Sequence, residues 1–515
     1  MIQEFISTFP GNVIFYIMVF VYLICSLILF VYAANCYLMV YLFNRRRNAE
    51  NKRNRNFLNK YSESFDAADL PVLTTQLPVY NEKNVVKRLI EAVAAIDYPR
   101  EKHEIQVLDD STDDTSPVIS ETVNKLKSEG VDIVHIQRGT REGFKAGALE
   151  HGLEISKGDF LAIFDADFVP GRDFFKKTVP FFNSHEKYAA VQARWGHLND
   201  RYSWLTTAQA IGLDAHFAVE QSARAWNDLY MNFNGTAGIW RKEAIIDAGG
   251  WQSDTLTEDM DLSYRTQLAG WKMKFVFNVC APAELPSNVT AFKSQQYRWA
   301  KGSTQTAIKL LGRILKSDDS LLKKFEAFLH LTHYAIHPLI LILAAMAMPV
   351  LFLSSYMLPV WAWCLLAGIF FISTIAPSSL YLFAQKVIYK KWLKRILYMP
   401  WLMCVGVGIA VNNSKAVFEA LLGIKSPFVR TPKLGDSPTG SKKKYFIKSF
   451  PIFWFEIIFG IYGAAAFVIC LNSHRLFIGY FMLVYAVGFL YIGISSLLEN
   501  RKFKISNSCP ASAAI

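Results

Sequence analysis

Long apolar stretches lie on both sides of one mixed polar region in this chain. Apolar residues dominate six stretches, at about 11–43, 328–354, 359–384, 396–411, 449–471 and 476–498. A membrane-spanning helix needs about 20 mostly apolar residues, so the pattern predicts an integral membrane protein. The first stretch has no Lys or Arg before it and is longer than the apolar part of a cleavable signal, which predicts a retained span.

The polar region begins near Leu70 and shows a different pattern. Short apolar runs end at polar turns, and each run leads into a stretch with helical character. The runs are VLTTQLPV, HEIQVLDD, VDIVHIQR and DFLAIFDA, with helices expected at 82–96, 115–128, 143–155 and 171–182. This alternation predicts a parallel α/β sheet. Ligands of such sheets bind beyond the carboxyl ends of the strands, where PVYNE, LDDSTDD and DADF lie.

Composition and charge support the membrane assignment. The 515 residues are 52% hydrophobic, with 55 Lys and Arg against 43 Asp and Glu. The basic excess collects beside apolar stretches, as at 45–47, 390–391 and 442–444, which indicates cytoplasmic membrane flanks and not nucleic-acid binding. The seven cysteines are scattered without CxxC or Cys/His spacing, so neither a zinc site nor a disulfide framework is indicated.

The charge around the fourth apolar stretch decides the predicted topology. Residues 415–450 carry eight Lys or Arg and two acids. If 396–411 crossed the bilayer, this basic segment and the basic tail at 501–504 would lie outside, against the positive-inside rule. We therefore expect 396–421 to form an interfacial helix. Five spans then remain, with the amino terminus outside, and with the carboxyl terminus and the domain at about 50–325 in the cytoplasm.

Two acidic motifs and a lysine in the polar region are candidates for nucleotide and metal binding. Asp165 and Asp167 follow an apolar run, and alternation on an extended chain would place both carboxylates on one side, suited to Mg²⁺ or Mn²⁺ against a diphosphate. The alternative is a solvated pair at a turn. Asp110 can face a nucleotide while Asp113 to Thr115 cap the following helix. Lys145 suits a phosphate or is a surface lysine.

Two later motifs are candidates for catalysis and acceptor binding. Glu258 and Asp259 precede a predicted helix at 260–268, where a carboxylate is either a helix-dipole partner or a general base. A second set lies on an amphipathic helix just before the next span and consists of Gln295, Arg298 and Trp299. Trp offers a face for stacking on a sugar and Arg can pair with a diphosphate. An interfacial Trp and a snorkelling Arg are the alternative.

Eight motifs in order give the chain a family resemblance. They are QLPVYNE, RLIEAVAAIDYP, IQVLDDSTDDT, GFKAGAL, VQARW, FNGTAG, TEDMDLSYR and QQYRW, within about 70–310. The chain resembles the inverting family 2 glycosyltransferases, and among them the processive synthases of the cellulose synthase superfamily, nearest to the cellulose-synthase-like (gluco)mannan and β-glucan synthases. The resemblance implies a GT-A-type α/β nucleotide-sugar-binding domain, with a mixed, mainly parallel sheet, inserted between the helices of an α-helical membrane domain.

The resemblance also implies roles for single residues. Nucleotide binding is expected of Tyr80, Glu82, Asp110, Lys145 and Asp165, with Lys145 at the diphosphate. Asp165 and Asp167 would hold Mg²⁺ or Mn²⁺, and Asp259, beside Glu258, would be the catalytic base. The acceptor and diphosphate side would consist of Phe233, Asn234, Gly235, Gln295, Arg298 and Trp299. FVRTPK at 428–433 is similar to a gating loop, with Phe428, Thr431 and Lys433 in the matching places, although Arg430 and Pro432 depart from the pattern.

The implied function is synthesis of a β-linked polysaccharide, a β-mannan, glucomannan or β-glucan, from GDP-mannose or UDP-glucose, with export through the protein's own spans. The implied partners are the nucleotide sugar, the growing polysaccharide and the bilayer of the plasma (inner) membrane. The expected divisions are 1–48, 49–325, 326–385, 386–448 and 449–515. Two alternatives are a single-transfer glycosyltransferase acting on a ceramide-like lipid and a non-catalytic pore component that senses sugar nucleotides.

Overall fold

Seven strands form one mixed sheet in the polar part of the chain. The computed structural model describes residues 9–63, 70–354, 360–426, 431, 433, 435 and 451–508. The strands are β1 (Leu73–Val79), β2 (His103–Asp109), β3 (Ile133–Ile136), β4 (Phe160–Ile163), β5 (Tyr188–His197), β6 (Gly238–Arg241) and β7 (Lys272–Ala283). Their order is β3-β2-β1-β4-β6-β5-β7, and only β6 runs antiparallel to its neighbours among these described strands. The mixed, mainly parallel sheet that we predicted is confirmed.

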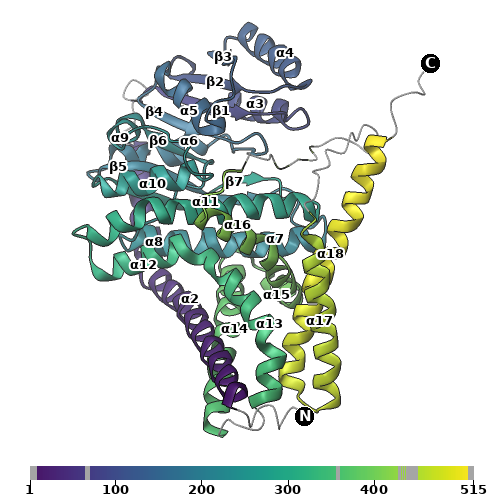
Figure 1. Ribbon diagram of the computed structural model, residues 1–515. Helices are drawn as coiled ribbons and strands as arrows, with labels where there is room; N and C mark the ends of the chain where they lie inside the picture. Colours follow the sequence, from purple (N-terminus) through teal and green to yellow (C-terminus); the bar gives the residue numbers. More distant parts are fainter. Residues whose placement is uncertain are drawn as a thin grey trace.

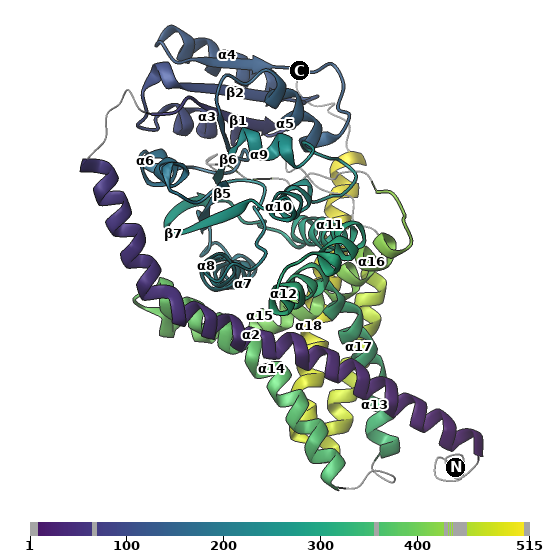
Figure 2. The same cartoon turned by 90° about the vertical axis from the view of Figure 1, so that its left-hand side faces the viewer.

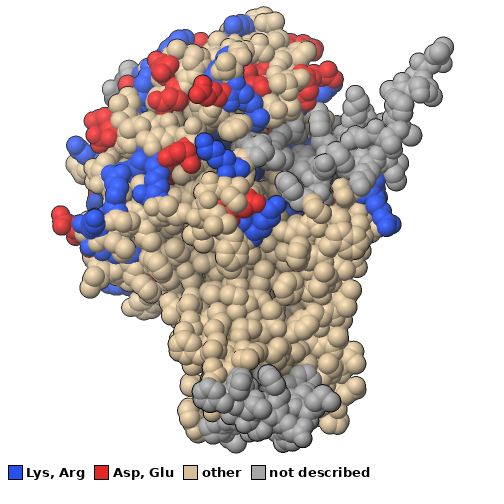
Figure 3. All heavy atoms as spheres, viewed as in Figure 1, with Lys and Arg blue, Asp and Glu red and all other residues tan. Residues whose placement is uncertain are grey.

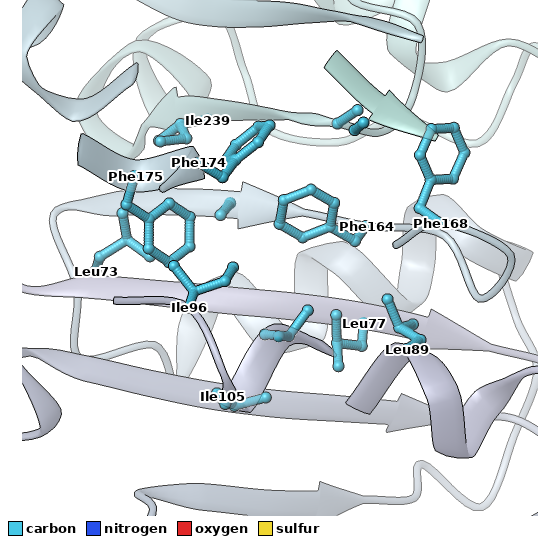
Figure 4. Packing of buried hydrophobic residues seen from close by; sticks show 14 of the residues in the cluster. Leu73, Leu77, Leu89, Ile96, Ile105, Phe164, Phe168, Phe174, Phe175 and Ile239 are labelled. Atoms are coloured by element: carbon cyan, nitrogen blue, oxygen red, sulfur yellow. The ribbon is translucent and has the colours of Figure 1, made fainter. Parts of the chain in front are cut away.

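Apolar side chains fix the helices on the sheet. The helices of this domain are α3 (Val86–Ala94), α4 (Thr115–Ser128), α5 (Phe144–Glu154), α6 (Phe174–Thr178), α9 (Lys242–Asp247) and α10 (Glu258–Leu268), with 3₁₀ turns η2 (Arg100–Lys102) and η3 (Val179–Asn183). α3 buries Val86, Leu89, Ile90 and Val93, which lie on one face at helical spacing. Figure 4 shows Leu89 beside Leu77 of β1, with Phe164 and Phe174 above them. All seven residues of β2 are buried, as expected of a parallel strand covered on both faces.

The first transmembrane helix continues far into the polar domain. α2 (Phe9–Glu63) has 55 residues, although the apolar stretch ends at Phe43. Figure 2 shows it rising from the amino-terminal end of the bundle to the side of the sheet. Its polar half is held by the ion pair between Lys274 and Glu50 (3.2 Å) and by Phe57, which stacks on Phe181 at 5.4 Å. The predicted division at residue 48 therefore falls inside one helix that joins membrane and domain.

Further helices lie at the junction between the sheet domain and the membrane bundle (Figure 1). They are α7 (Trp204–Ala215), the π-helix η4 (His216–Gln221), α8 (Ser222–Trp226), α11 (Val289–Lys316), α12 (Leu321–Thr332), η5 (His333–Ala335), η6 (Trp392–Tyr398), α15 (Met399–Gly408) and α16 (Ala410–Leu421). The bundle itself consists of α2, α13 (Ile336–Ser354), α14 (Val360–Ile388), α17 (Phe453–Asn472) and α18 (Leu476–Ser508). Figure 3 shows Lys, Arg, Asp and Glu on the domain, whereas the visible surface of the bundle is almost free of them. This distribution is typical of an integral membrane protein.

The segment that we expected at the membrane interface is divided in the structure. Within the described residues, five helical segments are long and apolar enough to cross a membrane, and Trp392–Leu421 is one of them. It consists of η6, α15 and α16, and it packs on α7 and α11 of the junction as well as on α18. Length and composition do not decide on which side of a bilayer it lies, so its interfacial position stays a prediction.

Two glycines let α15 and α18 approach closely. A Cβ atom on Gly408 would overlap the carbonyl oxygen of Gly488, and one on Gly488 would overlap the carbonyl oxygen of Cys404. Helices in membranes associate through such small residues because the apolar lipid gives no hydrophobic drive for their contact.

We expect Gly488→Ala to lower the thermal unfolding midpoint of the detergent-solubilised protein, because the added methyl group must push two backbones apart, at about 1–3 kcal/mol. Gly406→Ala is the matched control in the same crossing, because nothing lies within 4 Å of its Cβ position. Equal midpoints for the two variants, measured by a dye-based unfolding assay, would show that α15 and α18 do not pack tightly at Gly488.

Candidate active site

A cleft opens beyond the carboxyl ends of β1, β2 and β4, where the strand order changes direction. Its volume is about 210 Å³. The predicted site residues that line it are Tyr80, Glu82, Asp110, Lys145, Asp165, Asp167, Asn234, Gly235, Glu258, Asp259, Gln295, Arg298, Trp299, Thr431 and Lys433. Phe233 does not line it, because its side chain is fully buried and packs on Trp240 at 5.2 Å. Phe428 lies outside the described residues. The structure thus brings nearly the whole predicted set into one place.

The two acids of the DAD motif lie in a turn after β4 and not on the extended strand that we expected. β4 ends at Ile163, and the turn is closed by a hydrogen bond from the amide of Phe168 to the carbonyl of Asp165 (3.0 Å). Both carboxylates still line the cleft, each with a lysine. Lys145 Nζ is 2.6 Å from Asp165 Oδ1, and Lys433 Nζ is 2.5 Å from Asp167 Oδ2.

Lys145 lies among acids at the start of α5 and is not a surface lysine. Its ammonium donates to Asp165 and to the carbonyl of Gly235 (2.8 Å), and it lies 3.8 Å from Glu258. Burial lowers the pKa of Lys145, but the nearby Asp165 and Glu258 outweigh burial and leave the pKa raised. The side chain is therefore a permanent cation, available to a phosphate group.

Asp259 occupies the first turn of α10, which begins at Glu258, two residues before the predicted start. Its Oδ1 accepts a hydrogen bond from the amide of Met260 (2.8 Å). Burial and the adjacent Glu258 raise the pKa of Asp259 to about 7, although Lys145 opposes them. A carboxylate with such a pKa can accept a proton near neutral pH, as a general base must.

Gly235 allows these groups to meet. Its φ of 75° lies in the left-handed region, and a Cβ atom there would come within 2.9 Å of Asp259 Oδ2 and 3.2 Å of Lys145 Nζ. A larger residue would therefore be strained and would separate the base from the lysine. The glycine of the FNGT motif is required by the packing of the cleft floor.

The acids after β2 divide into structural and cleft-facing groups. Asp109 is buried, and although burial raises its pKa, hydrogen bonds from His135 (2.9 Å) and Ser111 hold that pKa well below its usual range. Asp113 accepts from the amide of Thr115 (3.0 Å) at the start of α4, as the capping alternative proposed. Asp109 and Asp113 therefore stabilise the loop, whereas Asp110 lines the cleft.

Sequence reasoning missed two arginines near Asp110, and one of them, Arg141, lines the cleft together with it. Arg138 binds the carboxylate of Asp110 through two hydrogen bonds, of 3.0 and 2.5 Å, and the guanidinium of Arg141 lies 3.4 Å over the ring of Tyr80. The only signal for them was a basic stretch, HIQRGTREG, after the third strand. Such a stretch is common in loops. The arrangement offers a flat aromatic face, a carboxylate and cations to a nucleoside.

α11 closes the acceptor side of the cleft. It carries Gln295, Arg298 and Trp299, and Arg298 donates to Thr431 Oγ1 (3.1 Å). Burial lowers the pKa of Arg298, but nearby acids, Glu258 first among them, oppose this effect. The guanidinium therefore faces the same acidic floor as Lys145 and is not a snorkelling residue of the membrane surface.

Lys433, one of the described residues of the predicted gating segment, lines the cleft. Besides Asp167, its ammonium contacts the carbonyl of Glu284 (2.8 Å), and its own carbonyl accepts from Asn84 Nδ2 (3.4 Å). Glu284, at the end of β7, was also missed by sequence reasoning. It pairs with Arg88 of α3 at 2.7 Å and accepts from the amide of Gly435 (3.2 Å).

The donor atoms of the cleft fit a hard divalent cation completed by substrate. Within the described residues, no group of three or more His, Cys, Asp and Glu could hold a metal on its own. Mg²⁺ typically binds one or two carboxylates together with phosphate oxygens, and Asp165 and Asp167 supply two carboxylates in one turn. Lys145 and Lys433, which pair with these two carboxylates, would have to share them with the metal ion or move away from them.

The chain is similar to known glycosyltransferases. The model of a family described as "Glycosyltransferase like family 2" matches residues 71–302. Probable glucomannan 4-beta-mannosyltransferase 7 of rice (Oryza sativa subsp. japonica) is 43% identical over 271 residues, 51% of this chain and 46% of the relative. Glucomannan 4-beta-mannosyltransferase 7 of Arabidopsis thaliana is 40% identical over 50% of this chain and 48% of its own length. The matched part thus spans about half the length of these two relatives.

A longer match comes from glucomannan 4-beta-mannosyltransferase 1 of rice, which is 33% identical over 451 residues, 82% of each chain. Among solved structures, mannosyltransferase PcManGT from Pyrobaculum calidifontis, in complex with GDP-Man and Mn²⁺, matches at 18% identity and a TM-score of 0.45, over 76% of this chain and 99% of that one. Because the longer rice alignment covers four-fifths of both proteins, the chain belongs to the family 2 glycosyltransferases, close to the cellulose-synthase-like mannan synthases.

Proposed function

We propose that this protein is a membrane-embedded, inverting glycosyltransferase that polymerises a β-linked mannan or glucomannan from GDP-mannose and passes it through its own helices. One observation carries the proposal. Asp259, whose pKa is raised to about 7, lines the same cleft as the donor-side acids and Trp299, and Trp299 belongs to α11, which adjoins the membrane bundle. The relatives named glucomannan 4-beta-mannosyltransferase support mannose as the donor sugar.

The donor would bind with its base at Tyr80 and its diphosphate beside Lys145. Tyr80 provides an aromatic face, while Asp110 accepts hydrogen bonds from base or ribose. The cation of Lys145 and the guanidinium of Arg298 reach the diphosphate from two sides. Asp165 and Asp167 would hold a divalent cation, which neutralises charge on the departing diphosphate when it is bound.

The transfer step would be a direct displacement. The acceptor hydroxyl loses its proton to Asp259, and its oxygen forms a bond to the anomeric carbon of the donor sugar. The bond from that carbon to the diphosphate oxygen breaks, and the electron pair leaves with the diphosphate beside Lys145 and Arg298. Attack from the face opposite the leaving group converts an α-linked donor into a β-linked product. Trp299 would keep the acceptor sugar in line by stacking on it.

The kind of product distinguishes polymerisation from the transfer of a single sugar. We expect the full-length protein in lipid nanodiscs, given radiolabelled GDP-mannose and Mn²⁺, to form a long polymer that β-mannanase degrades. UDP-glucose alone should give little polymer. A lipid-extractable product of one sugar would instead identify a single-transfer lipid glycosyltransferase and overturn the proposal.

Asp259→Asn should lower polymerisation about 10²–10⁴-fold, because it removes the base but keeps the shape of the side chain. Binding of the donor, measured by titration calorimetry, should stay within about twofold of wild type. Asp254→Asn is the control, an exposed acid on the loop before α10 that pairs with Lys309. Retained turnover in Asp259→Asn would exclude Asp259 as the base.

The pH profile should report the pKa of Asp259. Only the ionised carboxylate accepts a proton, so kcat/KM should fall about tenfold per pH unit below pH 7 and level off above it. Glu258 raises this pKa by charge repulsion, so Glu258→Gln should move the acidic limb to lower pH. Glu154→Gln, at an exposed position on α5, should leave the profile unchanged. An acidic limb that does not move in Glu258→Gln would contradict the assignment.

Metal binding should depend on the DAD acids. We expect Asp167→Asn to weaken Mn²⁺ binding in the presence of GDP at least about tenfold, because one of two charged oxygen ligands is lost. Electron paramagnetic resonance of free Mn²⁺ measures this without turnover. Asp173→Asn, an exposed acid of the same domain, should bind Mn²⁺ as wild type does. Unchanged affinity in Asp167→Asn would remove this residue from the metal site.

A further inference from the structure

A π-helix lies directly behind the cleft, between α7 and α8. π-helices are rare, and they frequently occur at functional sites. One side of η4 (His216–Gln221) is fixed by Phe217, which is buried and stacks on Trp195 of the cleft wall at 4.7 Å. Its other side carries His216 and Glu220, whose side chains are 26% and 33% exposed. The helix therefore carries a partly exposed His–Glu pair on one side while its other side is anchored to the cleft wall.

A directed chain of hydrogen bonds joins this pair to the cleft floor. Gln221 Nε2 donates to the carbonyl of Asn232 (2.7 Å) and to Asn234 Oδ1 (2.5 Å). The Asn234 amide nitrogen is therefore the donor to His216 Nε2 (3.1 Å), which leaves the imidazole proton on Nδ1. The Nδ1–H group of His216 then donates a hydrogen bond to Glu220 Oε2 (2.9 Å). Asn234 thus connects Glu220 with the FNGT loop, directly beside the glycine that contacts Asp259.

The pair faces the interior of the helical bundle. η4 packs on α2 and α14, and Glu220 interacts electrostatically with His333 of η5, Cys36 of α2 and Tyr381 of α14. Cys36 precedes Arg45 by about 13 Å of helix, inside the first apolar stretch. Ionisable side chains at such depth almost always face a protein interior or a polar cavity, and they mark substrate paths.

A structural ion pair already exists one turn away. Arg224 and Glu326 are both buried and pair at 3.2 Å, and Asn35 of α2 also donates to Glu326 (3.4 Å). These contacts join α8, α12 and α2. The more exposed Glu220, held by the hydrogen bond from His216, is not needed as a second clamp.

We propose that His216 and Glu220 form a subsite for the hydroxyl groups of the growing glycan, next to the acceptor sugar and on its way into the bundle. This inference rests on the proposed function. A carboxylate and an imidazole accept and donate hydrogen bonds to neutral hydroxyls, whereas the charge of Glu220 repels phosphate groups. By holding the chain between transfers, the subsite sets how many sugars are added before release.

The test compares chain length with donor consumption in the full-length protein in nanodiscs, with GDP-mannose and Mn²⁺. Glu220→Gln keeps the size of the side chain and an acceptor for His216 but removes the charge. We expect the average product to become about tenfold shorter, the scale expected from loss of one charged hydrogen bond. GDP release per enzyme and the dissociation constant of GDP-mannose should stay within about twofold of wild type. Glu220→Ala should shorten the product further.

The chain offers a matched control in His151 and Glu154, an exposed His–Glu pair on α5 outside the cleft. Glu154→Gln should leave product length unchanged. Equal product lengths in Glu220→Gln and Glu154→Gln would overturn the subsite, and so would a parallel loss of GDP release, donor binding and thermal stability in Glu220→Gln. A wild-type protein that forms no polymer would overturn the proposed function itself, which is a distinct result.

Discussion

The cleft depends on the ammonium group of Lys145. It contacts Asp165 at 2.6 Å, the carbonyl of Gly235 at 2.8 Å and Glu258 at 3.8 Å. Without this cation, Asp165, Glu258 and Asp259 would share a confined space with like charges and would repel one another. Lys145 therefore offsets the repulsion among these acids and opposes the effect of burial on the pKa of Asp259, and Gly235 makes the contact possible because it has no side chain.

Much of the fold and the membership of the cleft could be predicted from the sequence, but most contacts within the cleft could not. The run HEIQVLDD and the helix at 115–128 match β2 and α4 because apolar periodicity records which face is buried. The pairs Arg138–Asp110 and Lys433–Asp167 join residues 28 and 266 positions apart, and such tertiary contacts leave no periodic signal. The acids of DAD reach the cleft through a turn, so the expected position was right and its reason was wrong.

α2 shows the same limit of pattern reasoning. The apolar stretch ends at Phe43, but polar residues such as Lys, Arg and Asn also continue a helix when tertiary contacts support it. Here Glu50 binds Lys274 and Phe57 stacks on Phe181. α11 makes a second rigid connection, because its Lys293 forms a buried ion pair with Glu456 of α17, and Glu499 of α18 accepts from the amides at its start. The cleft is thereby fixed to the bundle on two sides.

These connections bear on how the proposed transfer and the proposed export are combined in one fold. Gly235 lies next to Asp259, the proposed base, whereas its neighbour Asn234 contacts His216 of η4. Two consecutive residues of one loop therefore connect the catalytic cleft with the helix that packs on the bundle. A displacement of this loop would change both environments together. A glycan that is extended at Asp259 and held at Glu220 would therefore lie beside the same loop at two points. This shared loop would couple the proposed transfer to the proposed translocation. Two hydrogen bonds hold Asn234 in place: its backbone amide donates to Gln192 Oε1, and its side-chain oxygen accepts from Gln221 Nε2.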